Sequence, residues 1–350
     1  MFLSIGMLKQ KYFLTDIFIL SAEKQPIKLS WRKIEWLRVA IIFVLICHSY
    51  SGDPLNGSFK EELYLVVRQI VTCAVPIFLA ESGFFLANKH FSNRIEFFNF
   101  WSMHSFRIWL PMVVWSIPLF FIREHENPIL SIVYLLLGGY SIYYFITLII
   151  QYYAMQPLFG RITRVGVILS LVLTALCLSI DNYYTSIQGH HISLFIECAP
   201  FVMWMAYPIG YYIGKNGRKY KVYPWLIIMT LGLVACVFET KWLYGYHENG
   251  IGATKISALI FSFSAIIVLF NEKTQKFFKS DSLWYSALVK VGEISFGIYL
   301  IHKYFLDFII APVINDTLLR ALLTLLLSVA FILFFKKIFP DKFLQMFGFR

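Results

Sequence analysis

The stretch WLRVAIIFVLICHSYSG, residues 36–52, places one arginine and one histidine within an otherwise apolar run. Arg38 and His48 are ten residues apart, so in a helix they lie roughly 15 Å apart along the axis and about 80° apart around it. Both side chains can therefore face one interior. Ionisable groups at membrane depth are costly unless they face protein or a water-filled cavity. The stretch therefore predicts a membrane helix with a functional polar side.

The whole chain has the composition of a protein that crosses a membrane many times. Of its 350 residues, 59% are hydrophobic, 19% are aromatic and only 15% are charged, which is far from the balance of a soluble domain. We expect an all-α, polytopic membrane helix bundle of about ten transmembrane helices. The apolar runs that predict them are 36–51, 63–87, 104–122, 141–159, 165–181, 194–214, 222–239, 255–270, 288–312 and 319–339.

The basic residues predict which helix ends face the cytoplasm. Of 31 lysines and arginines, 24 lie in the two terminal segments and in every second connection between spans. The other seven, including Arg68 and Lys255, are assigned to the opposite side. Because basic residues are enriched on the cytoplasmic side, both termini are predicted to be cytoplasmic. Residues 1–33 would form an interfacial segment, 34–340 the membrane domain and 341–350 a cytoplasmic tail.

The net charge of +11 is spread over several connections, whereas a nucleic-acid partner would need a clustered basic surface. The five cysteines have neither paired nor metal-type spacing, so neither a disulfide framework nor a metal site is expected. Cys47 precedes His48, but neighbours on a helix point about 100° apart. Covalent relay through Cys47 is therefore the weaker alternative.

Further ionisable residues lie toward the predicted inner side. Glu81 and Ser82 follow a proline in the second span, and Arg107 lies on the inner half of the third. Glu81 needs a cationic partner, for which Arg38 and Arg107 are the candidates. Glu35 lies three residues before Arg38, a spacing that lets the two side chains meet. The alternative is that both arginines only reach toward the membrane interface.

The ninth span carries a second histidine. Ser295, Tyr299 and His302 recur at helical spacing and form one polar stripe on an apolar helix. A structural role for a buried histidine is the alternative. Earlier in the chain, 129–137 is too short to span a membrane and predicts a half-helix that ends at Gly138-Gly139.

Three motifs carry a family resemblance. They are IEWLRVAIIFVLICH at 34–48, VPIFLAESGFFL at 75–86 followed by RIWLP at 107–111, and ISFGIYLIH at 294–302. Together they resemble the acyltransferase 3 family of bacterial membrane acyltransferases, which includes O-acetyltransferases of surface polysaccharides. Three positions depart from the family pattern. Glu35 stands where aspartate is commoner, Glu81 replaces an apolar residue, and YYF at 143–145 replaces Leu/Tyr-Trp-Phe.

The resemblance implies an enzyme of the bacterial cytoplasmic (inner) membrane. It would transfer an acyl group, by default acetyl, from cytoplasmic acyl-CoA to a hydroxyl of a cell-surface or lipid-linked glycan. A neutral imidazole accepts protons near neutral pH, which makes His48 the expected general base. The other assignments are Glu35 and Arg38 to catalysis, Arg38, Arg107 and Ser82 to acyl-CoA, and Glu81, Tyr299 and His302 to the acceptor side.

A transporter or flippase for a lipid-linked polysaccharide is the main alternative. In that case His48, Glu81 and Arg107 would serve substrate passage or proton coupling. Transporters often contain inverted repeats with two similarly broken helices. The second and ninth spans do not resemble each other in sequence, which favours the acyltransferase interpretation.

Overall fold

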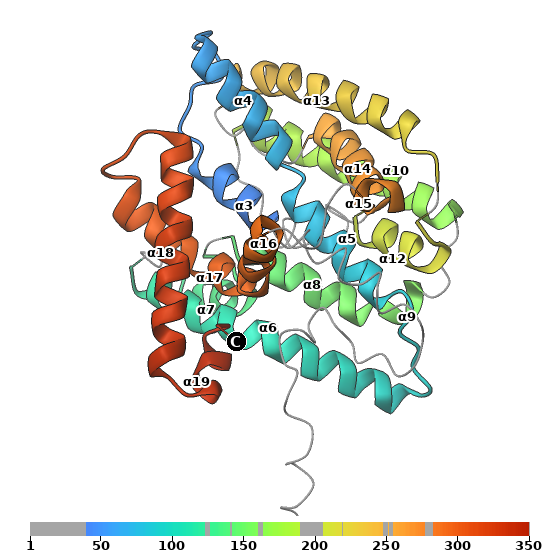
Figure 1. The fold of residues 1–350 in the computed structure, drawn as a ribbon, viewed down its shortest axis with the longest axis vertical. Coiled ribbons are helices and arrows are strands. Elements are labelled where there is room, and N and C mark those ends of the chain that lie inside the picture. The colour runs from blue at the N-terminus through green and yellow to red at the C-terminus, as the bar shows by residue number, and fades with distance from the viewer. Residues whose placement is uncertain are drawn as a thin grey trace, which may run out of the picture.

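The computed structural model describes residues 40–122, 127–140, 142–159, 164–189, 206–218, 220–247, 251, 255–276 and 283–349. Within these ranges helices are joined by turns and loops, and there is no strand (Figure 1). Two predicted site residues, Glu35 and Arg38, lie outside the described residues, as does the segment 1–33. Their placement therefore stays a prediction.

The helices up to the middle of the chain are α3 (Ala40–Ser49), α4 (Phe59–Val71), α5 (Ala74–Leu86), α6 (Arg94–Ile122), α7 (Pro128–Leu137), α8 (Tyr144–Ala154), α9 (Gln156–Phe159), α10 (Arg164–Asn182) and the π-helical segment η2 (Tyr183–Ile187). Those that follow are α12 (Ala206–Asn216), α13 (Tyr223–Tyr244), α14 (Ile256–Phe270), α15 (Glu272–Lys276), α16 (Leu283–Glu293), α17 (Ser295–Phe305), the π-helical segment η5 (Leu306–Ile310), α18 (Thr317–Ile338) and α19 (Asp341–Met346).

Five helical stretches in the described ranges are long and apolar enough to cross a membrane. They are Phe59–Leu86, Arg94–Ile122, Arg164–Thr185, Tyr223–Tyr244 and Thr317–Ile338. Helices α3, α8 and α14, which lie in other predicted spans, are apolar but shorter. The helical fold is therefore confirmed, whereas the number of ten spans and the cytoplasmic termini remain predictions.

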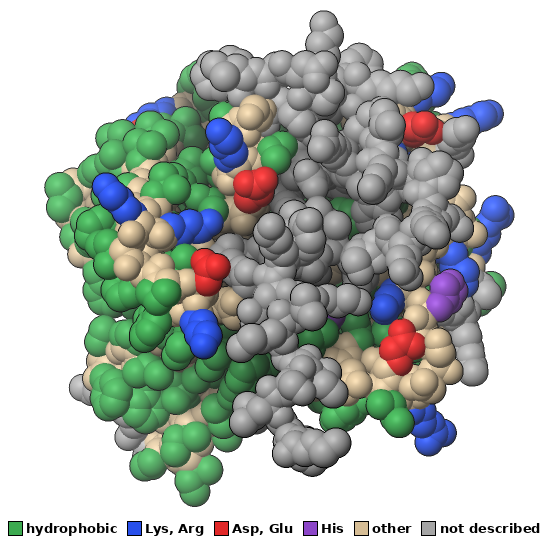
Figure 2. All heavy atoms as spheres, turned by 60° about the horizontal axis from the view of Figure 1, so that its bottom comes forward, with side chains coloured by type: hydrophobic (Ala, Val, Ile, Leu, Met, Phe, Trp, Pro, Cys, Tyr) green, Lys and Arg blue, Asp and Glu red, His purple; other side chains and the backbone are tan. Residues whose placement is uncertain are grey.

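The long helices turn apolar side chains outward and polar side chains inward. On α18, Thr324 and Ser328 are fully buried, whereas Leu322 and Leu326 are exposed. The face in Figure 2 shows the same pattern, because apolar side chains cover most of its left half and charged ones are few and scattered. Such a surface suits lipid, where helices must satisfy polar groups inside the protein.

Helices α5 and α12 pack with their backbones nearly touching. A Cβ atom on Gly210 would lie 1.8 Å from the carbonyl oxygen of Ala80, and one on Gly83 would lie 2.2 Å from that of Tyr207. Gly214 meets Phe84 in the same way. Small residues that let helix backbones approach closely are typical of packing within membranes. We call this contact the α5–α12 seam.

Two predicted local features are confirmed. Helix α7 ends at Gly138, which adopts a left-handed conformation with φ 75°, as a C-terminal glycine cap requires. The second span is broken between α4 and α5, at residues 72–73. Pro76 explains the break, because it has no N–H to donate to the carbonyl of Thr72.

Candidate active site

Two histidines from opposite ends of the chain meet inside the bundle. Nδ1 of His48, on α3, lies 2.9 Å from Nε2 of His302, on α17. The two rings are nearly parallel, with an angle of 6° between their planes and 5.2 Å between their centroids. His302 is fully buried, whereas His48 is partly accessible. The residue predicted as base and the polar stripe of the ninth span therefore belong to one site.

The hydrogen bonds decide which ring nitrogen carries each proton. Nδ1 of His302 lies 3.1 Å from the carbonyl oxygen of Ile298 and 2.9 Å from that of Tyr299, and carbonyl oxygens only accept. In neutral His302, Nδ1 therefore carries the proton and Nε2 accepts. Nδ1–H of His48 must then donate to it, which leaves the lone pair on Nε2 of His48. Among the described residues, none forms a hydrogen bond with that nitrogen.

Helix α17 is held beside His48 by two tyrosines. The hydroxyl of Tyr143 donates to the carbonyl of Leu300 over 2.5 Å, and the hydroxyl of Tyr299 donates to the carbonyl of Ile142. Tyr143 is the first residue of the YYF departure, so this tyrosine supports the site instead of disturbing it. The hydroxyl proton of Tyr299 is engaged with backbone, which leaves its predicted contact with the acceptor as a proposal.

The residues predicted for the inner side lie on α5 and α6. Glu81 is fully buried, and Ser82 is buried with its hydroxyl donating to the carbonyl of Phe78 over 3.0 Å. Arg107 is half-buried on α6. The structure thus places all three within the bundle, but on different helices from the histidine pair.

His104, three residues before Arg107, was missed by the sequence analysis. Its ring is buried, its Nδ1 lies 2.8 Å from the carbonyl of Phe100, and its centroid is 4.2 Å from that of Phe100. Arg107 lies close enough to interact with it electrostatically. A histidine in an apolar run so near Arg107 was the signal that could have found it.

Arg68 and Lys255 correct the assignment of charges to loops. Arg68 is only 8% exposed and Lys255 only 1%, so both lie inside the bundle. The ammonium of Lys255 donates to Thr240 over 2.7 Å and to Gln69 over 3.1 Å. The signal was the position of Arg68 within the apolar run 63–87. It was counted as a loop charge although it interrupts a span.

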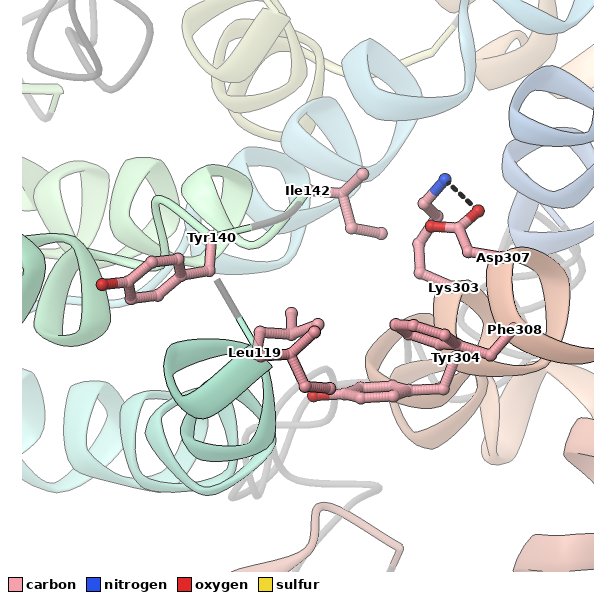
Figure 3. Close-up of a pocket in the computed structure, with 8 residues that line it drawn as sticks. Leu119, Tyr140, Ile142, Lys303, Tyr304, Asp307 and Phe308 are labelled. Atoms are coloured by element: carbon pink, nitrogen blue, oxygen red, sulfur yellow. Dashed lines mark hydrogen bonds and ion pairs between the residues drawn. The ribbon is translucent and has the colours of Figure 1, made fainter. Parts of the chain in front are cut away.

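A cavity of about 260 Å³ lies beside the part of α17 that directly follows His302. Leu119 and Ile142 line it together with Lys303 and Tyr304 (Figure 3). Lys303 forms an ion pair with Asp307, at 2.8 Å, on the wall of this cavity. The wall is otherwise mainly apolar and aromatic, so the space fits an apolar chain or a sugar face better than an ion.

The described residues contain no group of three or more histidine, cysteine or acidic side chains that could hold a metal ion. A family model described as an acyltransferase domain (Acyl_transf_3) matches residues 31–337, nearly the whole chain. No curated protein and no solved structure matches the chain.

Proposed function

Because the chain belongs to the acyltransferase 3 family, we propose that this multi-pass membrane acyltransferase is an O-acyltransferase that uses acyl-CoA. Its acceptor is a hydroxyl of a cell-surface or lipid-linked glycan, and acetyl is the expected acyl group. The observation that carries the proposal is the contact of His48 with His302 together with the two backbone contacts of His302, from which a lone pair on Nε2 of His48 follows. A base needs such a lone pair within reach of the substrate.

The reaction is a single transfer. The acceptor hydroxyl gives its proton to Nε2 of His48 while its oxygen forms a bond to the thioester carbonyl carbon. The carbon–sulfur bond then breaks, and the CoA thiolate takes the proton back from His48. During this step His302 stabilises the imidazolium of His48 by accepting its Nδ1–H, and it holds the ring in one orientation. His302 is therefore a positioning residue.

The donor enters from the cytoplasmic side in this scheme. Arg38 and Arg107 hold phosphate or pantetheine oxygens by charge-assisted hydrogen bonds, Glu35 orients Arg38, and Ser82 lines the path. Arg38 precedes His48 by ten residues, or roughly 15 Å along a helix, a separation that the extended pantetheine arm can cover. No acyl-enzyme is needed. The protein acts in the bacterial cytoplasmic membrane with both termini in the cytoplasm.

The test is release of CoA from acetyl-CoA and succinyl-CoA by the purified protein, with and without candidate glycans. His48→Ala should lower the rate about a thousandfold, the range of general base catalysis, with unchanged membrane insertion and thermal unfolding. His90→Ala is the control, because His90 is an exposed histidine beyond α5. Full activity of His48→Ala would show that His48 is not the general base. Glycan transport without CoA release would favour a transporter.

A further inference from the structure

Buried polar atoms without a partner gather next to His48. They are the hydroxyl oxygens of Ser49 and Tyr50, Oε2 of Glu61, Nε and Nη1 of Arg68, and Nε2 of Gln69. We call these five residues the α3–α4 polar cluster. None of these atoms has a hydrogen-bond partner among the described residues. Because nearly all buried polar groups in proteins are hydrogen-bonded, such a concentration calls for water or a ligand.

One half of the cluster surrounds Gly52. A Cβ atom on Gly52 would lie 2.2 Å from Oε2 of Glu61 and 2.9 Å from the hydroxyl of Tyr50. A side chain at this position would fill the space between the carboxylate and the phenol. Because residue 52 is glycine, the space between the Glu61 carboxylate and the Tyr50 hydroxyl stays open.

The other half is centred on Arg68. Its guanidinium is close enough to His48, Tyr50 and Lys255 to interact with each of them electrostatically. The neighbouring Gln69 accepts the hydrogen bond from Lys255 through Oε1, while its Nε2 keeps both hydrogens available. Within the cluster, Arg68 is therefore the residue close to His48, and Gln69 is the residue that contacts Lys255.

We propose that the α3–α4 polar cluster is the acceptor subsite and binds a neutral, polyhydroxylated sugar ring, with one ring hydroxyl directed at Nε2 of His48. This inference rests on the proposed function and deepens it. Sugar hydroxyls both donate and accept, so different hydroxyls of one ring can satisfy the carboxylate of Glu61 and the guanidinium of Arg68. An anionic sugar is disfavoured, because the charge of Arg68 is matched by Glu61 and that of the neighbouring Lys255 by the nearby Glu239.

The cluster is separate from the donor path. Ser82 follows Arg68 by fourteen residues and lies on α5, beyond the break that separates α5 from α4. Substitutions in the cluster should therefore change the use of the acceptor and leave binding of acyl-CoA intact. A general loss of structure would change both.

The experiment uses the full-length protein in nanodiscs with two probes, octyl β-glucoside as the neutral sugar and octyl β-glucuronide as its anionic counterpart. Binding of each is measured by calorimetric titration, and acetyl transfer to each by CoA release. Glu61→Gln and Arg68→Gln should each weaken glucoside binding at least tenfold, with the KM for acetyl-CoA within twofold of the wild type. The control is Glu62→Gln, whose carboxylate pairs with Lys241 on α13.

The outcomes separate the two proposals. Glucoside binding that is lost in both variants, in a protein that releases no CoA, would contradict the enzyme and leave the subsite standing. CoA release with unchanged glucoside affinity in both variants would overturn the subsite alone. Tighter binding of glucuronide than of glucoside by the wild type would overturn the proposed preference for a neutral sugar. A raised KM for acetyl-CoA in Arg68→Gln would show that Arg68 contributes to binding of acyl-CoA instead of the acceptor.

Discussion

The α5–α12 seam and the α3–α4 polar cluster lie in one bundle and are built on opposite principles. The seam brings backbones together at Gly83, Gly210 and Gly214 and leaves no room for a single methyl group. The cluster buries Nε and Nη1 of Arg68 and Oε2 of Glu61, and these three atoms have no hydrogen-bond partner among the described residues. Close packing stabilises a fold, whereas polar groups without partners destabilise it. The contrast assigns the seam to stability and the cluster to binding.

The largest effect should come from filling the seam. Gly210→Leu places a side chain where even a Cβ atom lies 1.8 Å from backbone, so α5 and α12 must separate. Overpacking typically costs about 1–3 kcal/mol and sometimes more, and here the clash is with backbone atoms of Ala80 and not with a flexible side chain. We expect at least about 3 kcal/mol of lost stability, measured as thermal unfolding in detergent. Gly245→Ala, at the end of α13 with its closest neighbour 3.3 Å away, is the control.

Normal unfolding of Gly210→Leu would show that the seam is not where stability resides. If Gly245→Ala were equally harmful, any glycine substitution would destabilise the bundle. The loss of stability in Gly210→Leu could then not be attributed to the close packing of the seam.

A smaller effect is expected at the histidine pair, which lies next to Arg68 of the polar cluster. His302→Ala removes the acceptor for Nδ1–H of His48, so the ring can turn and lose the orientation of its lone pair. Losing such a supporting group typically costs about 10–100-fold, and we expect this loss in kcat, with KM for the acyl donor nearly unchanged. His302→Gln should restore part of the rate, because an amide oxygen can accept the same bond.

Kinetics of CoA release by the two variants and the wild type, over a range of pH, are the measurement. Equal losses in the alanine and glutamine variants would indicate that His302 only fills space. A rise in KM without a change in kcat would place it in binding.

The sequence predicted the histidine pair only in part, and the reason is geometric. His48 and His302 were each singled out because an ionisable residue in an apolar helix is costly. Their contact joins residues 254 positions apart, and no local periodicity encodes such a distance. The helical fold, the half-helix α7 and the break in the second span were predictable because they depend on composition, glycine and proline within one turn.

Arg68 of the polar cluster and Lys255, which contacts the cluster through Gln69, were missed for a different reason. Arg68 and Lys255 were assigned to loops because the charge rule counts basic residues near helix ends without regard to their burial. Both lie within the bundle. Membrane helices that are broken or short, such as α3 and α4, carry their polar residues into the interior, and span counting cannot show this.

The smallest effect concerns Asp316, an ionisable residue that joins α4 to the start of α18. Asp316 precedes α18 and accepts a hydrogen bond from the hydroxyl of Tyr64, at 2.7 Å, while Lys60 pairs with it at 3.1 Å. Nearby, the hydroxyl of Ser51 donates to the carbonyl of Asn315 over 2.6 Å. The loop that carries Gly52 is thus tied to α18 by polar contacts, without any close packing of the kind found in the seam.

These contacts predict a stability that depends on pH. The hydrogen bond from Tyr64, the backbone N–H of Leu319 and the pairing with Lys60 lower the pKa of Asp316 from 3.8 to about 2. Because the folded pKa is the lower one, the stabilisation is fully present above about pH 4 and is lost as the pH falls through 2. About a third of the Asp316 side chain is accessible to solvent, as is more than half of its partner Lys60, and this solvent screens the effect.

The measurement is the difference in thermal unfolding between the wild type and Asp316→Asn, which should be largest at pH 5 and shrink toward pH 2. Asp341→Asn, at the start of α19, is the matched control for removing an aspartate at a helix start. A constant difference would mean that the charge of Asp316 contributes nothing. The contacts beside the polar cluster depend on the charge of Asp316, whereas the seam depends on close packing at glycines. Acid should therefore weaken the contacts of Asp316 and leave the seam unchanged.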